Sequence, residues 1–119
     1  MFATDGVWDN LSSQDLLGLV SEKMTVSGAW VNASNRGVQV GGDLGELVQQ
    51  PPSDDREKSL QTVIATRIVE KAKEASMDER RDSPFAKAVR RHYPSERYFG
   101  GKPDDICVVV GIAVDEGLL

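Results

Sequence analysis

The chain has 119 residues, of which 14 are Lys or Arg and 19 are Asp or Glu, so its formal net charge is −5. This length suffices for one small domain or a piece of one. An apolar content of 39% with 28% charged residues is typical of a globular chain and excludes collagen-like, coiled-coil and wholly disordered classes. The single Cys107 excludes an internal disulfide and a cysteine-rich zinc site.

The apolar runs are too short for a membrane span. The longest run, residues 106–114, has nine residues, about half of the ~18–20 that a spanning helix needs. The first ten residues, MFATDGVWDN, contain two acids and no basic region, which argues against a secretory signal or an Arg-rich transit peptide. We expect any targeting segment to lie outside this chain, and we suspect that the chain starts within a domain.

The first predicted elements are a short strand and an amphipathic helix. Residues 2–4 are compatible with a strand, which the turn dipeptide Asp5-Gly6 would end. The run SSQD at residues 12–15 offers hydroxyl caps and an early acid, and apolar residues then follow at helical spacing. These signals predict a helix over residues 13–23.

Residues 25–58 show no sustained period and contain five glycines. We interpret this stretch as an insertion loop, and loops of such length are usually either functional or mobile, of which we favour mobile. Leu44, Leu47 and Val48 could form one helical turn within it, and Trp30 could anchor it to the body of the protein.

A second helix is predicted over residues 59–75, with Ser59 as its cap. One apolar stripe runs along it, made of Leu60, Val63, Ile64, Ile68, Ala72 and Ala75. A third, shorter helix over residues 85–91 is predicted from Ser83-Pro84, a cap followed by proline at the first helical position, and Pro94 would end it.

The last predicted element is a strand over residues 106–114. Its residues are apolar on both faces, which is typical of a strand inside a layered structure. Because two strands alone do not form an independently stable sheet, the other strands of such a structure must lie elsewhere.

Charge is unevenly distributed, because residues 80–102 carry seven cations and two acids, a local balance of +5, and the remainder carries −10. Such a segment is usually a solvated helix face. It could also attract a phosphate-bearing partner, whereas the acidic remainder disfavours nucleic acid as the main ligand.

Two carboxylate groups flank the predicted strands: Asp5 at the end of the first, and Asp104 with Asp105 before the last. If the strands lie antiparallel, these carboxylates converge at one sheet edge. Oxygen ligands suit hard divalent cations. Turn formation is the alternative, since Asp-Gly and Pro-Asp-Asp sequences are mostly turns.

The string FATDGVWDN, followed about ninety residues later by GGKPDDICVVVGIAV, resembles the C-terminal part of the type 2C metal-dependent serine/threonine protein phosphatases, the PPM family. The intervening SPFAKA resembles the mitochondrial-type subgroup. The resemblance covers residues 2–24 and 59–115 and implies a partial α-β-β-α sandwich of the α+β class, an incomplete sheet with two packed helices. We therefore expect residues 1–119 to be the C-terminal portion of a phosphatase domain that lacks its N-terminal half.

The resemblance implies that Asp5 and Asp104 are ligands of a binuclear Mg or Mn centre. Gly6 would permit a close backbone approach, and Asp105 would orient the turn. A water activated by the metals attacks phosphoserine or phosphothreonine in this family, so the expected substrate is a phosphoprotein. The Trp8-Asp9-Asn10 turn would have a structural role.

The basic residues Arg90, Arg91 and Lys102 are candidates for substrate steering. His92 is expected to be a surface residue at a helix end, and Cys107, in a strand expected to be buried, is given no catalytic role. Because the first half of the family's metal site is absent from the sequence, we predict no activity for this chain alone. The alternative function is a non-catalytic binding or regulatory remnant that uses residues 80–102. The subgroup suggests mitochondria.

Overall fold

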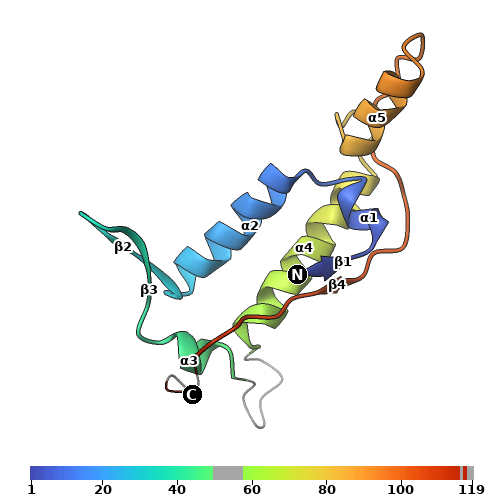
Figure 1. The fold of residues 1–119 in the computed structure, drawn as a ribbon. Helices are drawn as coiled ribbons and strands as arrows, with labels where there is room; N and C mark the ends of the chain where they lie inside the picture. Colours follow the sequence, from blue (N-terminus) through green and yellow to red (C-terminus); the bar gives the residue numbers. More distant parts are fainter. Residues whose placement is uncertain (50–57, 116, 118–119) are drawn as a thin grey trace.

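The computed structural model describes residues 1–49, 58–115 and 117. It contains both helices and strands, in agreement with the expected α+β class (Figure 1). In chain order the elements are β1 (Phe2–Ala3), α1 (Asp5–Trp8), α2 (Ser13–Val26), β2 (Trp30–Ala33), β3 (Gly37–Val40), α3 (Leu44–Leu47), α4 (Leu60–Ser76), α5 (Pro84–His92) and β4 (Val108–Val109). Within the described ranges, none of the helices combines the length and apolarity that crossing a membrane requires.

Helix α2 begins where the sequence predicts and continues to Val26, three residues beyond the predicted end. Its first turn is closed by a capping box. The Ser12 hydroxyl accepts from the Asp15 amide at 3.1 Å, and the Asp15 carboxylate accepts from the Ser12 amide at 2.8 Å. These two bonds satisfy amide groups that the helix itself leaves unpaired.

Helix α4 packs against α2, α1 and β4 and forms the centre of the molecule. Five of the six predicted stripe residues are buried, and the sixth, Val63, is half-buried. Ser59 occupies the predicted cap position, but its hydroxyl bonds the Thr62 hydroxyl at 2.9 Å and makes no side-chain bond to a helix amide. The stability of α4 therefore comes from packing of its apolar stripe rather than from a cap.

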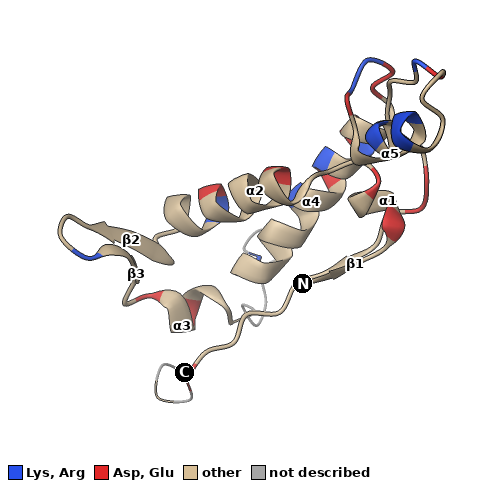
Figure 2. Cartoon of the chain, turned by 45° about the horizontal axis from the view of Figure 1, so that its top comes forward, with Lys and Arg blue, Asp and Glu red and all other residues tan. Residues whose placement is uncertain are grey.

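Helix α5 begins as predicted, because the Ser83 hydroxyl accepts from the Ala86 amide at 3.0 Å and Pro84 occupies the first helical position. His92 is the last residue of α5 and is exposed, as expected for a helix end. Figure 2 shows that Lys and Arg residues gather on and around α5, whereas acidic residues mark α1 and the segment leading to β4.

Strands β1 and β4 pair antiparallel, with Phe2 opposite Val109 and Ala3 opposite Val108. The prediction of a continuous strand over residues 106–114 is wrong, since only Val108–Val109 forms a ladder in the described part of the chain. The physical reason is the partner's length: β1 offers two residues, and a ladder ends where its partner ends.

The extended segment around β4 has one covered face and one exposed face. Alternate residues pack against the helical core: Ile106, Val108, Val110, Ile112 and Val114. The residues between them, at positions 107, 109, 111 and 113, are exposed. Cys107 lies on this exposed face, so the expectation that it is buried is wrong.

The interpretation of residues 25–58 as an unstructured loop misses a hairpin. Strands β2 and β3 pair antiparallel over four residue pairs, and Gly37 takes a φ of 70° at the turn. Helix α3 is the helical turn that the leucines predict, and Trp30 packs on the core. Residues 50–57 lie outside the described residues, and the mobility of this stretch stays a prediction.

The molecule is extended for its length. Its radius of gyration is 17.3 Å, against about 13.5 Å expected for a compact domain of this size. The strands form two separate pairs, β1 with β4 and β2 with β3. The two packed helices are found in the structure, and the specific sandwich of the type 2C phosphatases stays a prediction.

Candidate metal centre

Two of the predicted metal ligands meet at one end of the β1–β4 pair. Asp5 follows β1 and begins α1, and Asp104 precedes β4 in the same antiparallel arrangement. Carboxylate oxygens of Asp5, Asp9 and Asp104 lie within 4.8 Å of one another. The structure thus brings Asp5 and Asp104 together, as the antiparallel pairing of their strands predicts.

Asp9 is the member of this cluster that the sequence analysis missed, because it was assigned a structural role in a turn. Its signal was the sequence spacing: Asp9 follows Asp5 by four residues, about one helical turn, so the two residues lie on the same side of the turn that α1 forms. The Asp9 amide donates to the Asp5 carbonyl at 2.8 Å, which closes that turn. Of the three carboxylates, Asp9 is half-buried and the other two are exposed.

Lys102 extends into the same cluster. Its ammonium lies 2.9 Å from an Asp9 carboxylate oxygen and 3.5 Å from one of Asp104. The hydrogen bond to Asp9 raises the pKa of Lys102 above its usual value; partial desolvation opposes this shift, and the charges of Asp9 and Asp104 add to it. The Lys102 side chain is therefore paired with the cluster, and its role in substrate steering stays a prediction.

Asn10 links the segment that carries Asp5 and Asp9 to the segment that carries Asp104, and it is fully buried. Its Nδ2 donates to the carbonyls of Gly6 and Lys102, both at 2.8 Å, and its Oδ1 accepts from the Lys102 amide at 2.7 Å. These bonds hold the turn after α1 against a segment more than ninety residues away. Asn10 is therefore a positioning residue for the acidic cluster.

Gly6 lies where the backbone of α1 meets the start of the β4 segment. A Cβ on Gly6 would overlap the carbonyl oxygen of Asp105, so only glycine fits without a shift of backbone. The same carbonyl accepts from the Thr4 hydroxyl at 3.0 Å, and the Asp105 amide donates to the Asp104 carboxylate at 2.8 Å. Asp105 is outside the carboxylate cluster and contributes backbone contacts to this turn.

The predicted steering arginines differ in their surroundings. Arg90 pairs with the Asp82 carboxylate, donates to the Tyr98 carbonyl at 2.7 Å and lies 4.3 Å from the Phe99 ring centroid. These contacts tie Arg90 to the segments before and after α5. Arg91 is exposed, and within the described part of the chain it forms no ion pair.

The donor set fits a hard divalent cation. Carboxylate oxygens are the ligands that Mg²⁺ and Mn²⁺ prefer, and the cluster lies at the surface, where water would complete the coordination. Lys102 neutralises part of the acidic charge in the structure as it stands. A cation bound between the carboxylates would compete with this ammonium.

The chain is similar to two curated proteins. It is 31% identical to "Probable protein phosphatase 2C 80" of Arabidopsis thaliana over 107 residues, which cover 90% of this chain and 18% of that protein. It is 32% identical to "Protein phosphatase PTC7 homolog fig" of Drosophila melanogaster over 110 residues, which cover 92% of this chain and 25% of the relative. The chain thus spans a quarter or less of the length of these relatives. No family model and no solved structure matches it.

Proposed function

We propose that this chain belongs to the type 2C family of metal-dependent serine/threonine protein phosphatases and forms the C-terminal portion of its catalytic domain. The observation that carries the proposal is the meeting of Asp5 and Asp104, from the two motifs that resemble the family, in one carboxylate cluster. The similarity to two proteins named as protein phosphatases supports it. Assignment to the mitochondrial-type subgroup rests on the SPFAKA motif.

In this proposal Asp5 and Asp104, with Asp9 beside them, hold Mg²⁺ or Mn²⁺. The bound ions would activate water and neutralise charge that develops on the phosphoryl group of a phosphoprotein substrate. Asn10 and Gly6 keep the carboxylates together from two distant segments. Three carboxylates close together repel one another without a positive partner, and Lys102 supplies that positive charge. A bound cation would take over this role and displace the ammonium.

The isolated chain should bind a divalent ion weakly and hydrolyse no phosphopeptide. Affinity for such ions rises with the number and preorganisation of the ligands, and three surface carboxylates form a small set. The remaining ligands and the phosphate-binding groups would come from parts of the relatives that this chain does not span. This accords with the 18% and 25% of the relatives' lengths that it covers.

The proposal is tested in a chimera in which this chain replaces the matching segment of the Drosophila relative. We expect Mn²⁺-dependent hydrolysis of a phosphothreonine peptide, lost in Asp5→Asn and in Asp104→Asn. Asp43→Asn is the matched control, because it removes the same charge from a residue outside the cluster.

Mn²⁺ binding, measured on the same chimeras, separates a folding failure from a wrong assignment. A folded chimera that binds Mn²⁺ equally well with and without the Asp5 and Asp104 carboxylates would contradict the proposal. So would phosphatase activity that both variants retain.

A further inference from the structure

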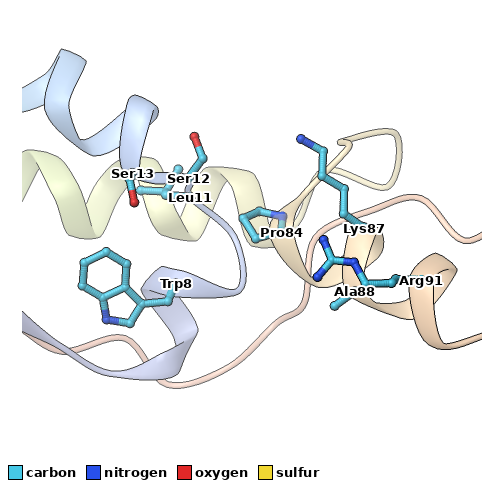
Figure 3. A pocket seen from close by; sticks show the side chains of 8 residues that line it. All are labelled: Trp8, Leu11, Ser12, Ser13, Pro84, Lys87, Ala88 and Arg91. Carbon is cyan, nitrogen blue, oxygen red and sulfur yellow. The ribbon is translucent and has the colours of Figure 1, made fainter.

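An open pocket of about 420 Å³ lies between α5 and the chain that connects α1 to α2, separate from the carboxylate cluster. Two cations, two hydroxyls, an indole and a proline are among the side chains around it (Figure 3). They belong to Lys87, Arg91, Ser12, Ser13, Trp8 and Pro84. No carboxylate is among the described residues that line this pocket.

The two cations are four residues apart and therefore share one face of α5. Figure 3 shows both charged ends extending from α5 toward the side where Pro84 lies. Both residues are exposed, and neither forms an ion pair with any residue that the structure describes. Two unpaired cations on one wall make the pocket a site for negative charge.

The neighbouring acid does not neutralise these cations. Asp15, three residues after Ser12, pairs with Arg81 at 3.0 Å and bonds the Ser12 amide at 2.8 Å. Its charge is therefore already compensated by another cation and by the cap of α2. Arg90, the cation beside Arg91 in sequence, is likewise paired. Among the described residues that line the pocket, Lys87 and Arg91 are therefore the cations free to meet a ligand.

The opposite wall of the pocket suits the carbon part of a side chain. Trp8 is 43% exposed, and its indole nitrogen donates to the Ala3 carbonyl at 3.3 Å, which fixes the ring. An aliphatic stem can lie on this ring while its charged end meets the cations on α5 and the serine hydroxyls. A pocket with an indole on one side and two cations on the other fits an acidic side chain better than a bare ion.

We propose that this pocket binds an acidic side chain of an extended peptide, a glutamate or a phosphorylated residue, in the substrate protein. The inference rests on the proposed function, because it places the pocket beside the proposed metal centre. Trp8 of the pocket directly precedes Asp9 of the carboxylate cluster. Pro84 of the pocket directly precedes Phe85, whose ring centroid lies 5.2 Å from the Lys102 ammonium. The pocket and the cluster are thus adjacent along two segments of the chain. The pocket would select substrates with an acid near the phosphorylated residue.

The test is peptide binding to the 119-residue chain without metal, in the presence of a chelator. The chain has two tryptophans, so Trp30→Phe leaves Trp8 as its only tryptophan, which is excited at wavelengths that tyrosine does not absorb. The unmodified chain is titrated in parallel. The probes are a glutamate-containing peptide, the same peptide with glutamine, the phosphoserine form, and inorganic phosphate. We expect saturable changes in Trp8 emission with the two acidic peptides.

The variant Lys87→Gln/Arg91→Gln should weaken this binding about tenfold, since it removes two exposed charge-assisted contacts. The matched control is Arg80→Gln/Arg97→Gln, which removes the same charge from the same basic segment but from residues that do not line the pocket. It should change the affinity less than about twofold. Circular dichroism confirms that each variant is folded.

Three results would overturn the inference: equal binding of the glutamine peptide, equal losses in the two double variants, or inorganic phosphate matching the peptides in affinity. The last result would mean that the pocket binds a free oxyanion and not a peptide side chain. Because the assay uses no metal and no hydrolysis, its failure leaves the proposed phosphatase function standing. Failure of the chimera assay would in turn leave measured peptide binding intact.

Discussion

Substitution of Asn10 by alanine should destabilise the protein more than any surface change in the same region. Asn10 is fully buried and makes three hydrogen bonds to the backbone of Gly6 and Lys102. At about 1 kcal/mol net for each bond, Asn10→Ala should lower the free energy of unfolding by about 3 kcal/mol, and by more where the released backbone groups stay dry. The same change should weaken Mn²⁺ binding, because the segment that carries Asp104 is no longer fixed against α1.

Urea denaturation followed by circular dichroism measures the first effect, and calorimetric titration with Mn²⁺ measures the second. Asn32→Ala is the matched control, because Asn32 is exposed on β2; it should change stability by less than about 0.5 kcal/mol. A loss of stability in Asn10→Ala no larger than in the control would refute the reasoning. It would mean that the backbone groups of Gly6 and Lys102 find other partners at no cost.

Three further predictions concern single contacts. Asp15→Ala should lower the free energy of unfolding by about 1 kcal/mol, because it opens the capping box. Partial burial raises the pKa of Asp15, but the hydrogen bonds with Ser12 and the charge of Arg81 outweigh it and bring the pKa below the usual 3.8. This contribution to stability is therefore present above pH ~4 and is lost as the pH falls through the folded-state pKa. Equal losses at pH 7 and pH 2 would contradict it. Gly6→Ala should reduce Mn²⁺ binding and melting temperature, while Gly111→Ala, with open space at its Cβ, should change neither. Lys102→Met should strengthen Mn²⁺ binding in calorimetry by removing a competing ammonium, and weaker binding would show that Lys102 organises the carboxylates instead.

Local signals in the sequence predicted the helices well. The SSQD run, the Ser83-Pro84 pair and the stripe on α4 each act over one or a few turns, so their physical causes are visible in neighbouring residues. The meeting of Asp5 and Asp104 was predictable for a different reason. It followed from one assumption, that the first and last strands pair antiparallel, which the structure bears out.

The parts that sequence reasoning missed depend on distant contacts. The ladder of β4 is short because β1 has only two residues, and no pattern within residues 106–114 encodes the length of a partner. Asp9 was read as part of a turn because its role depends on where Asp104 and Lys102 lie. The β2–β3 hairpin was missed because its two strands have four residues each, too few to show a period among the surrounding glycines and asparagines.

The most direct test of the central claim is Mn²⁺ binding by this chain, measured from the loss of the free-ion electron paramagnetic resonance signal. The account predicts weak, saturable binding that disappears in Asp5→Asn/Asp104→Asn and persists in the control Asp43→Asn/Asp115→Asn, which removes the same charge outside the cluster. Equal binding by the two double variants would contradict the assignment of Asp5 and Asp104 as metal ligands.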